Sequence, residues 1–158
     1  MENTRDAEIG GKIRTEPNWI GGLTPVHAEF VPPPPEEVSA LLDDLCAYVS
    51  GEDHSALMQA ALAHAQFETI HPFADGNGRT GRALLQLVLR RRGIAQHFVP
   101  PISLVLATCS KQYVAALMGM RTEDAQTAAE GVTEWLELIA QATRMACQQA
   151  HILSLIHI

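Results

Sequence analysis

The order of apolar and polar residues along the chain follows the period of a helix in several segments. Residues 36–49 alternate apolar side chains with acidic ones, and residues 55–70 are strong helix formers without glycine or proline. Residues 79–92 place large aliphatic side chains at helical spacing, ahead of a glycine that suits a helix end. Two more helices are expected at residues 103–120 and 133–147. The pattern predicts a chain built mainly from helices.

The segment before the first predicted helix has a different pattern. Residues 12–20 and 26–31 flank Gly21-Gly22, a pair that suits the turn of a β-hairpin. Residues 32–35 are four prolines, which form a stiff spacer that ends at the helix start. A hairpin has free edges, so an extended segment of another protein could pair with one through main-chain hydrogen bonds. The alternative is an ordinary surface hairpin.

Length and charge narrow the class of protein. The 158 residues with 47% apolar content suit one domain with one core. The net charge of −7 argues against a nucleic acid or an anionic membrane as partner. No apolar stretch reaches the roughly 18–20 residues of a membrane span, and no signal peptide opens the chain. We therefore expect a cytoplasmic protein.

Two further features concern the thiols and the end of the chain. Cys46, Cys109 and Cys147 have neither the spacing of a zinc site nor that of a disulfide framework, so we expect buried, reduced thiols. Residues 153–158 are similar to a translated sequencing adapter, and we interpret residues 151–158 as a non-native tail. The predicted domain spans residues 1–150.

Residues 71–82 (HPFADGNGRTGR) carry the candidate chemistry, because their glycines open a predicted helix. A helix N-terminus presents unsatisfied N–H groups and a positive dipole end, and it therefore binds anions. Gly76 and Gly78 let the backbone approach a phosphate closely. Arg79 and Arg82 lie in the first turn, where a cation is unfavourable unless an anion is nearby. These residues predict an anion site.

His71 and Asp75 add a base and a metal ligand. Pro72 disfavours helical geometry at His71, so the preceding helix should end there and turn the imidazole toward the loop. A histidine titrates near neutrality, and a general base of this kind contributes roughly 10²–10⁴-fold to a rate. Asp75 is a natural Mg²⁺ ligand beside phosphates. Taken singly, each feature is usually structural: a capping histidine, a turn or solvated arginines.

The spacing Gly76-x-Gly78-x-x-Gly81 also spells a dinucleotide-binding fingerprint. That fingerprint needs a strand before it and an acidic residue about 20 positions later. A predicted helix precedes the glycines, and residues 96–101 contain no carboxylate. The dinucleotide-binding interpretation is therefore rejected.

The twelve residues resemble the active-site motif of the Fic (Fic/Doc, Fido) family, His-Pro-Phe-x-Asp/Glu-Gly-Asn-Gly-Arg-x-x-Arg. The resemblance extends over about residues 10–140. It implies an all-α fold, the Fic-fold helical bundle, with a small β-hairpin flap at about 12–31. It places the core helices at about 36–149 and the active-site loop at 71–82.

The family resemblance implies an adenylyltransferase that transfers AMP from ATP to a Ser, Thr or Tyr hydroxyl of a target protein, with Mg²⁺. His71 would be the catalytic base and Asp75 the metal ligand. Arg82 would pair with the γ-phosphate and Phe73 would anchor the loop in the core. The residues that the resemblance assigns to ATP binding are Phe73, Gly76, Asn77, Gly78, Arg79, Gly81 and Arg82. The region around Tyr113 would lie near the adenine.

Three alternatives stay open beside AMP transfer. Family members with Lys in place of the second loop glycine act as kinases, whereas this chain has Gly78, which favours AMP transfer. A Fic-type phosphotransferase, a de-AMPylase and a non-catalytic nucleotide-binding module remain as alternatives.

The resemblance also implies regulation by a helix with the pattern Ser/Thr-x-x-x-Glu-Gly/Asn, whose carboxylate competes with ATP for the second motif arginine. Thr4 and Glu8 have the spacing, but Ile9 follows them, and the segment 127–131 has the wrong spacing. We expect that an inhibitory helix was lost by truncation or is supplied by an antitoxin partner. Target protein docking is expected on the flap.

Overall fold

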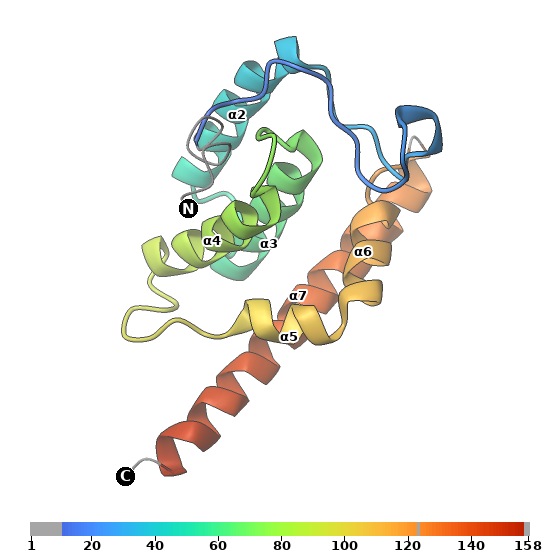
Figure 1. Ribbon diagram of the computed structural model, residues 1–158. Helices are drawn as coiled ribbons and strands as arrows, with labels where there is room; N and C mark the ends of the chain where they lie inside the picture. Colours follow the sequence, from blue (N-terminus) through green and yellow to red (C-terminus); the bar gives the residue numbers. More distant parts are fainter. Residues whose placement is uncertain (1–10, 123, 157–158) are drawn as a thin grey trace, which may run out of the picture. The chain divides into compact units, whose positions relative to one another are not determined.

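The structure is a computed structural model that describes residues 11–122 and 124–156, with side chains through Ile152. These residues form a short 3-10 helix and six α-helices (Figure 1). In chain order they are η1 Pro25–His27, α2 Pro35–Ser50, α3 Ala56–Ile70, α4 Asn77–Arg91, α5 Ile102–Thr108, α6 Ser110–Gly119 and α7 Ala125–Ile156. The described ranges contain no β-strand, and the helical fold class is confirmed.

The expected two-stranded hairpin is reduced to a single antiparallel bridge in the part of the chain that the structure describes. Ile20 and Phe30 exchange two backbone hydrogen bonds of 2.9 and 3.2 Å. Gly21 and Gly22 both have positive φ, as the turn signal predicted, and η1 follows them. Prolines on both sides of this bridge lack the N–H that a longer ladder requires.

The helix expected at residues 103–120 is two helices, α5 and α6, which meet at an angle of 94°. Thr108 Oγ1 and Cys109 Sγ both donate to the carbonyl of Val105, at 2.7 and 3.4 Å. Side chains of this kind compete with the helical hydrogen bonds of the backbone. The Cys109 N–H then bonds to Leu106, three residues back, and the first helix ends.

The last helix, α7, begins at Ala125, eight residues before the start at 133 that the sequence pattern predicted. The reason is the residue before it, Asp124, whose carboxylate accepts hydrogen bonds from the backbone N–H and the hydroxyl of Thr127, at 2.8 and 2.6 Å. This arrangement caps α7, and the same bonds lower the pKa of Asp124. The helix continues through Ile156, into the segment interpreted as a tail.

The chain divides into two compact units. One comprises Met1–Asp53 and Ala63–Leu84, and the other comprises His54–Leu62 and Leu85–Ile158. In the first unit, Gln66 of α3 donates a 2.9 Å hydrogen bond to Asp44 of α2. This unit contains the whole loop between α3 and α4, and therefore every residue of the predicted motif.

In the second unit, α6 packs along α7 and α5 also contacts it (Figure 1). Gly119 and Gly131 permit a close approach, because a Cβ on Gly131 would lie 2.3 Å from the Gly119 carbonyl oxygen. Trp135 is completely buried, and its indole N–H donates to the carbonyl of Ala61 at 2.9 Å. Its ring packs against that of Tyr113, with ring centroids 5.6 Å apart. Tyr113, expected near the adenine, is thus part of the packing of this unit.

Two surface properties bear on the expectations from the sequence. Cys46 and Cys147 are exposed, so the prediction of buried thiols is wrong for these two. Each lies at an exposed position of its helix, a placement that cysteine's apolar character did not reveal.

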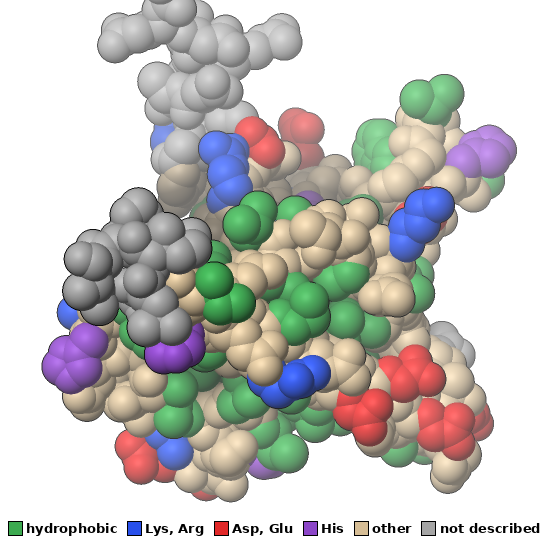
Figure 2. Space-filling model, turned by 90° about the horizontal axis from the view of Figure 1, so that it is seen from below, with side chains coloured by type: hydrophobic (Ala, Val, Ile, Leu, Met, Phe, Trp, Pro, Cys, Tyr) green, Lys and Arg blue, Asp and Glu red, His purple; other side chains and the backbone are tan. Residues whose placement is uncertain are grey.

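Hydrophobic side chains also reach the surface between charged ones (Figure 2), most of all Leu23 and Val26. No single helix in the described ranges is both long and apolar enough to cross a membrane.

Candidate active site

The loop begins at a strained residue. The His71 N–H closes the last turn of α3 by donating to Phe67 at 2.9 Å, and His71 then takes a left-handed backbone with φ +48°. Among the described residues, His71 is the only one with positive φ that is not glycine. A conformation of this kind costs about 1–3 kcal/mol and is found mainly where function or the surrounding structure requires it.

Asn77 holds the loop closed. Its side-chain amide makes two hydrogen bonds to the backbone of Phe73, accepting from the N–H at 2.8 Å and donating to the carbonyl at 2.7 Å. The Phe73 ring packs against Phe67 of α3, with ring centroids 6.0 Å apart. The side-chain amide of Asn77 is therefore occupied by the Phe73 backbone. Its backbone N–H lies in the first turn of α4.

Asp75 lies at the exposed tip of the loop. One carboxylate oxygen accepts from the Gly76 N–H at 2.6 Å, and the other lies 3.4 Å from the guanidinium of Arg79. Both side chains are largely exposed, at 69% and 77%, so this ion pair is weak. A carboxylate held only in this way keeps lone pairs that can bind a cation.

The N-terminus of α4 forms the floor of the site. Gly76 has φ +85° and accepts the first helical hydrogen bond, from Thr80 at 3.0 Å. The N–H groups that follow Gly76 have no partner within the helix. The Arg82 guanidinium lies close above Gly78, since a Cβ there would be 3.0 Å from Arg82 Nη1. Backbone donors and guanidiniums thus face the same space.

A pocket of about 310 Å³ opens over this floor. It is lined by His71, Ala74, Asp75, Gly76, Asn77, Gly78, Arg79 and Arg82. The structure thus brings together seven of the nine residues that the sequence assigned to the site. The arrangement is suited to holding a polyanion beside an imidazole.

The other two assigned residues, Phe73 and Gly81, do not line this pocket. Gly81 instead faces α3, where a Cβ would lie 2.5 Å from Glu68 Oε1 and 2.9 Å from His64 Nδ1. Its role in the structure is to let α4 approach α3. Phe73 anchors the loop through its ring and backbone, as described above.

His64 is completely buried beneath the loop. Desolvation lowers its pKa to about 4, and the positive charge of Arg82 acts in the same direction. The imidazole is therefore uncharged at neutral pH, and its 3.9 Å approach to Glu68 is not an ion pair there. His64 supports the helix pair that carries the loop.

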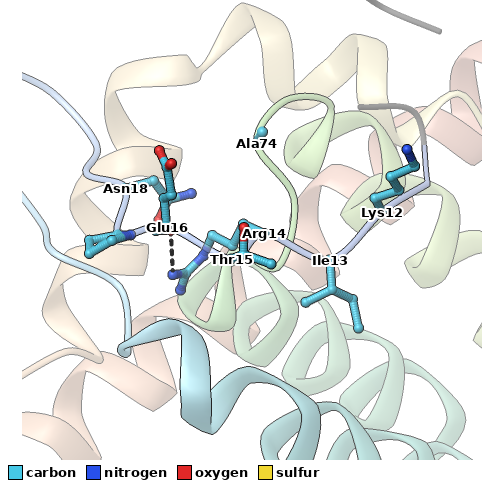
Figure 3. Close-up of a pocket in the computed structure, with 8 residues that line it drawn as sticks. Lys12, Ile13, Arg14, Thr15, Glu16, Asn18 and Ala74 are labelled. Atoms are coloured by element: carbon cyan, nitrogen blue, oxygen red, sulfur yellow. Dashed lines mark hydrogen bonds between the residues drawn. The ribbon is translucent and has the colours of Figure 1, made fainter. Parts of the chain in front are cut away.

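Two residues of the N-terminal segment also contact the loop, and the sequence analysis did not identify them. Arg14 donates to the carbonyl of His71 at 2.9 Å, and Asn18 donates to the carbonyl of Phe73 at 3.3 Å. Residues 12–18 line a second pocket of about 400 Å³ that also reaches Ala74 of the loop (Figure 3). No spacing rule points to them, because their partners lie more than 50 residues away.

A helical domain in which the loop between two helices brings an imidazole, guanidiniums and a helix N-terminus to one pocket is the class of protein that this geometry defines. The model of the Fic/DOC family matches residues 1–89. The chain belongs to that family.

Named relatives agree with this assignment. The chain is 37% identical over 113 residues to "Protein adenylyltransferase fic-1" of Caenorhabditis briggsae, covering 70% of this chain and 20% of the relative. It is 36% identical over 107 residues to "Protein adenylyltransferase Fic" of Drosophila virilis, covering 66% of this chain and 20% of the relative. The chain therefore spans about a fifth of the length of these relatives.

Solved structures show the same fold. A Fic family protein from Desulfovibrio desulfuricans matches with a TM-score of 0.69 and 29% identity, over 89% of this chain and 42% of that one. Fic-1 from C. elegans, residues 134–508 with E274G, matches with a TM-score of 0.50 and 27% identity, over 87% of this chain and 38% of that one.

Proposed function

We propose that this chain carries the catalytic domain of a protein adenylyltransferase, which transfers AMP from ATP to a Ser, Thr or Tyr hydroxyl of a target protein. The observation that carries the proposal is the loop pocket, in which His71 shares one space with the N-terminus of α4 and two guanidiniums. Relatives named protein adenylyltransferases make AMP the group expected to move. The proposed domain spans residues 1–150, with 151–158 as a non-native tail.

In this reaction the target hydroxyl oxygen forms a bond to the α-phosphorus of ATP. The bond from that phosphorus to the oxygen bridging to the β-phosphate breaks, and pyrophosphate leaves with the electron pair. His71 accepts the proton of the hydroxyl. The N–H groups at the start of α4 and the two arginines stabilise the negative charge on the phosphates.

The residues of the loop fit a bound Mg²⁺. Magnesium takes one or two carboxylates and completes its shell with phosphate oxygens and water. Asp75 supplies one exposed carboxylate at the rim of the pocket. When bound, the ion would neutralise negative charge on the phosphates, and Asp75 would hold it.

The segment 12–31 is proposed to dock the target protein. Outside η1 and the bridges Ile13–Phe73 and Ile20–Phe30 its backbone is irregular, most of its residues other than Arg14 are exposed, and it borders the loop at Ala74. An extended target segment could pair with its backbone and bring a hydroxyl over His71.

Regulation is proposed to act on Arg82, through an inhibitory carboxylate that competes with the γ-phosphate for its guanidinium. The candidate pair Thr4 and Glu8 lies outside the described residues. A partner protein is the other proposed source of this carboxylate.

Intact-mass measurement after incubation with ATP and Mg²⁺ tests the proposed function. A target, or the chain itself by auto-modification, should gain the mass of one AMP. A gain of one phosphate would indicate the phosphotransferase alternative instead. No gain on any protein of a lysate would contradict enzymatic transfer and favour a nucleotide-binding module.

A further inference from the structure

Arg14 is a buried arginine in an otherwise exposed segment. Only 6% of its surface is accessible, whereas the residues on either side of it are exposed. Its guanidinium donates to the carbonyls of Ile70 and His71, at 3.3 and 2.9 Å, and to that of Pro33. It also donates to the carbonyl of Glu16 (Figure 3). Its own N–H donates to the carbonyl of Pro72 at 2.8 Å.

Three of these acceptors are consecutive: Ile70, the last residue of α3, and the two residues that follow it. The last carbonyls of a helix have no partner within it, and a cation near them is favoured by the helix dipole. Arg14 therefore caps α3 from a position 57 residues earlier in the chain than His71. A planar guanidinium can hold several carbonyls at once in a fixed geometry, which an ammonium cannot.

The same contacts bear on the strained backbone of His71. A left-handed residue after a helix is usually glycine or asparagine, because a Cβ is unfavourable there. At this position the chain has a histidine at φ +48°. Arg14 holds the carbonyl of His71 with its side chain and the carbonyl of Pro72 with its backbone, so the two peptide planes that follow the histidine are fixed by one residue.

We propose that Arg14 is the positioning residue that holds His71 in this conformation and so directs the imidazole into the loop pocket. This inference rests on the proposed function for the role of His71 as a base. Its structural content, the fixed orientation of the His71 ring, does not depend on that function. Asn18 adds longer hydrogen bonds, to the same His71 carbonyl at 3.5 Å and to the carbonyl of Phe73 at 3.3 Å.

Arg14→Lys tests the proposal, because it keeps the positive charge and removes the planar fork. A displacement of about 1 Å in a reacting group can lower a rate about 10²-fold. We expect kcat for AMP transfer to fall roughly 10- to 100-fold while the KM for ATP stays unchanged, since the phosphate floor lies on α4. Arg144→Lys, on the exposed side of α7, is the matched control and should leave both values unchanged.

NMR of the ring nitrogens of labelled histidines supplies a measurement that needs no activity. The His71 signal is identified by its loss in His71→Asn, and the buried His64 reports on the packing of α3 against α4. In Arg14→Lys the His71 signal should shift or broaden while the His64 signal stays in place. If this occurs in a chain that transfers no AMP, the positioning role stands and the proposed function fails.

Two results would overturn the proposal. An unchanged His71 signal with unchanged kcat would show that the guanidinium does not orient the ring. Equal changes in the His71 and His64 signals would show that Arg14 supports the whole helix pair rather than this residue.

Discussion

His71 is the residue on which the proposed chemistry depends, and its backbone geometry decides how it should be replaced. Asparagine tolerates left-handed backbone better than most residues, so His71→Asn removes the base with less change to the loop than His71→Ala. We expect either variant to lose transfer by roughly 10²–10⁴-fold. Both should still bind ATP, because the groups proposed to bind the phosphates lie at the start of α4.

Intact-mass rates together with calorimetric ATP binding would measure both properties of the His71 variants. His97→Asn, at an exposed position between α4 and α5, is the matched control. Transfer by His71→Asn at the rate of the parent would show that another group is the base.

His64 makes a prediction for stability against pH. Its pKa is about 4 in the folded protein, against 6.5 for an exposed histidine. The unfolded chain therefore takes up the proton first as the pH falls, and stability that is complete above pH 6.5 is lost toward pH 4. The loss from this one residue amounts to about 3 kcal/mol.

Urea unfolding at pH 7 and at pH 4 would measure the contribution of His64. The His64→Gln variant cannot titrate at this position, so its stability should fall by about 3 kcal/mol less than that of the parent over this range. Equal losses in parent and variant would show that folding does not lower the pKa of His64.

At the scale of elements, the contact between α3 and α4 sets the position of the loop. Gly81 leaves no room for a Cβ against Glu68 and His64. Alanine is favoured over glycine in a helix by about 1 kcal/mol, so Gly81→Ala would stabilise α4 if the space were open. Because the space is filled, we expect a net destabilisation of about 1–3 kcal/mol.

Chemical denaturation of Gly81→Ala measures whether the free energy of unfolding rises or falls. Thr80→Ala, an exposed neighbour on the same helix, is the comparison. A stabilised Gly81→Ala variant would contradict the close approach of α3 and α4.

At the scale of the whole molecule, ligand binding should raise the melting temperature of the folded chain. A ligand that binds only the folded state adds about 2.7 kcal/mol at a concentration 100 times its Kd. ATP with Mg²⁺ should therefore raise the melting temperature of the chain, and Arg82→Ala should reduce this shift. In Asp75→Asn the shift should lose its dependence on Mg²⁺, because the proposed metal ligand is gone.

Differential scanning fluorimetry measures these shifts, with Arg144→Ala as the control for loss of an exposed arginine. A shift in Arg82→Ala as large as that of the parent would contradict the assignment of Arg82 to the phosphates.

Much of the local structure could be predicted from the sequence. The helices α2, α3 and α4 lie close to the expected ranges, because helix propensity and apolar spacing act within a few residues. Seven of the nine residues assigned between His71 and Arg82 line one pocket, since the loop is short and its ends are fixed by two helices, although their assigned roles stay predictions. The break at Cys109 was missed, because hydroxyl and thiol competition with the backbone leaves the apolar period unchanged.

By itself, the sequence determined the chemistry of the loop, the helices on each side of it and, through the motif, the family of the chain. Only the tertiary structure decided that Gly81 serves helix packing, that His64 is buried and neutral, and that Arg14 holds the carbonyl of His71. The physical reason is the range of the interactions. Propensity, capping and turn formation act between neighbours in the chain, whereas burial and the partners of a distant guanidinium exist only after the chain has folded back on itself.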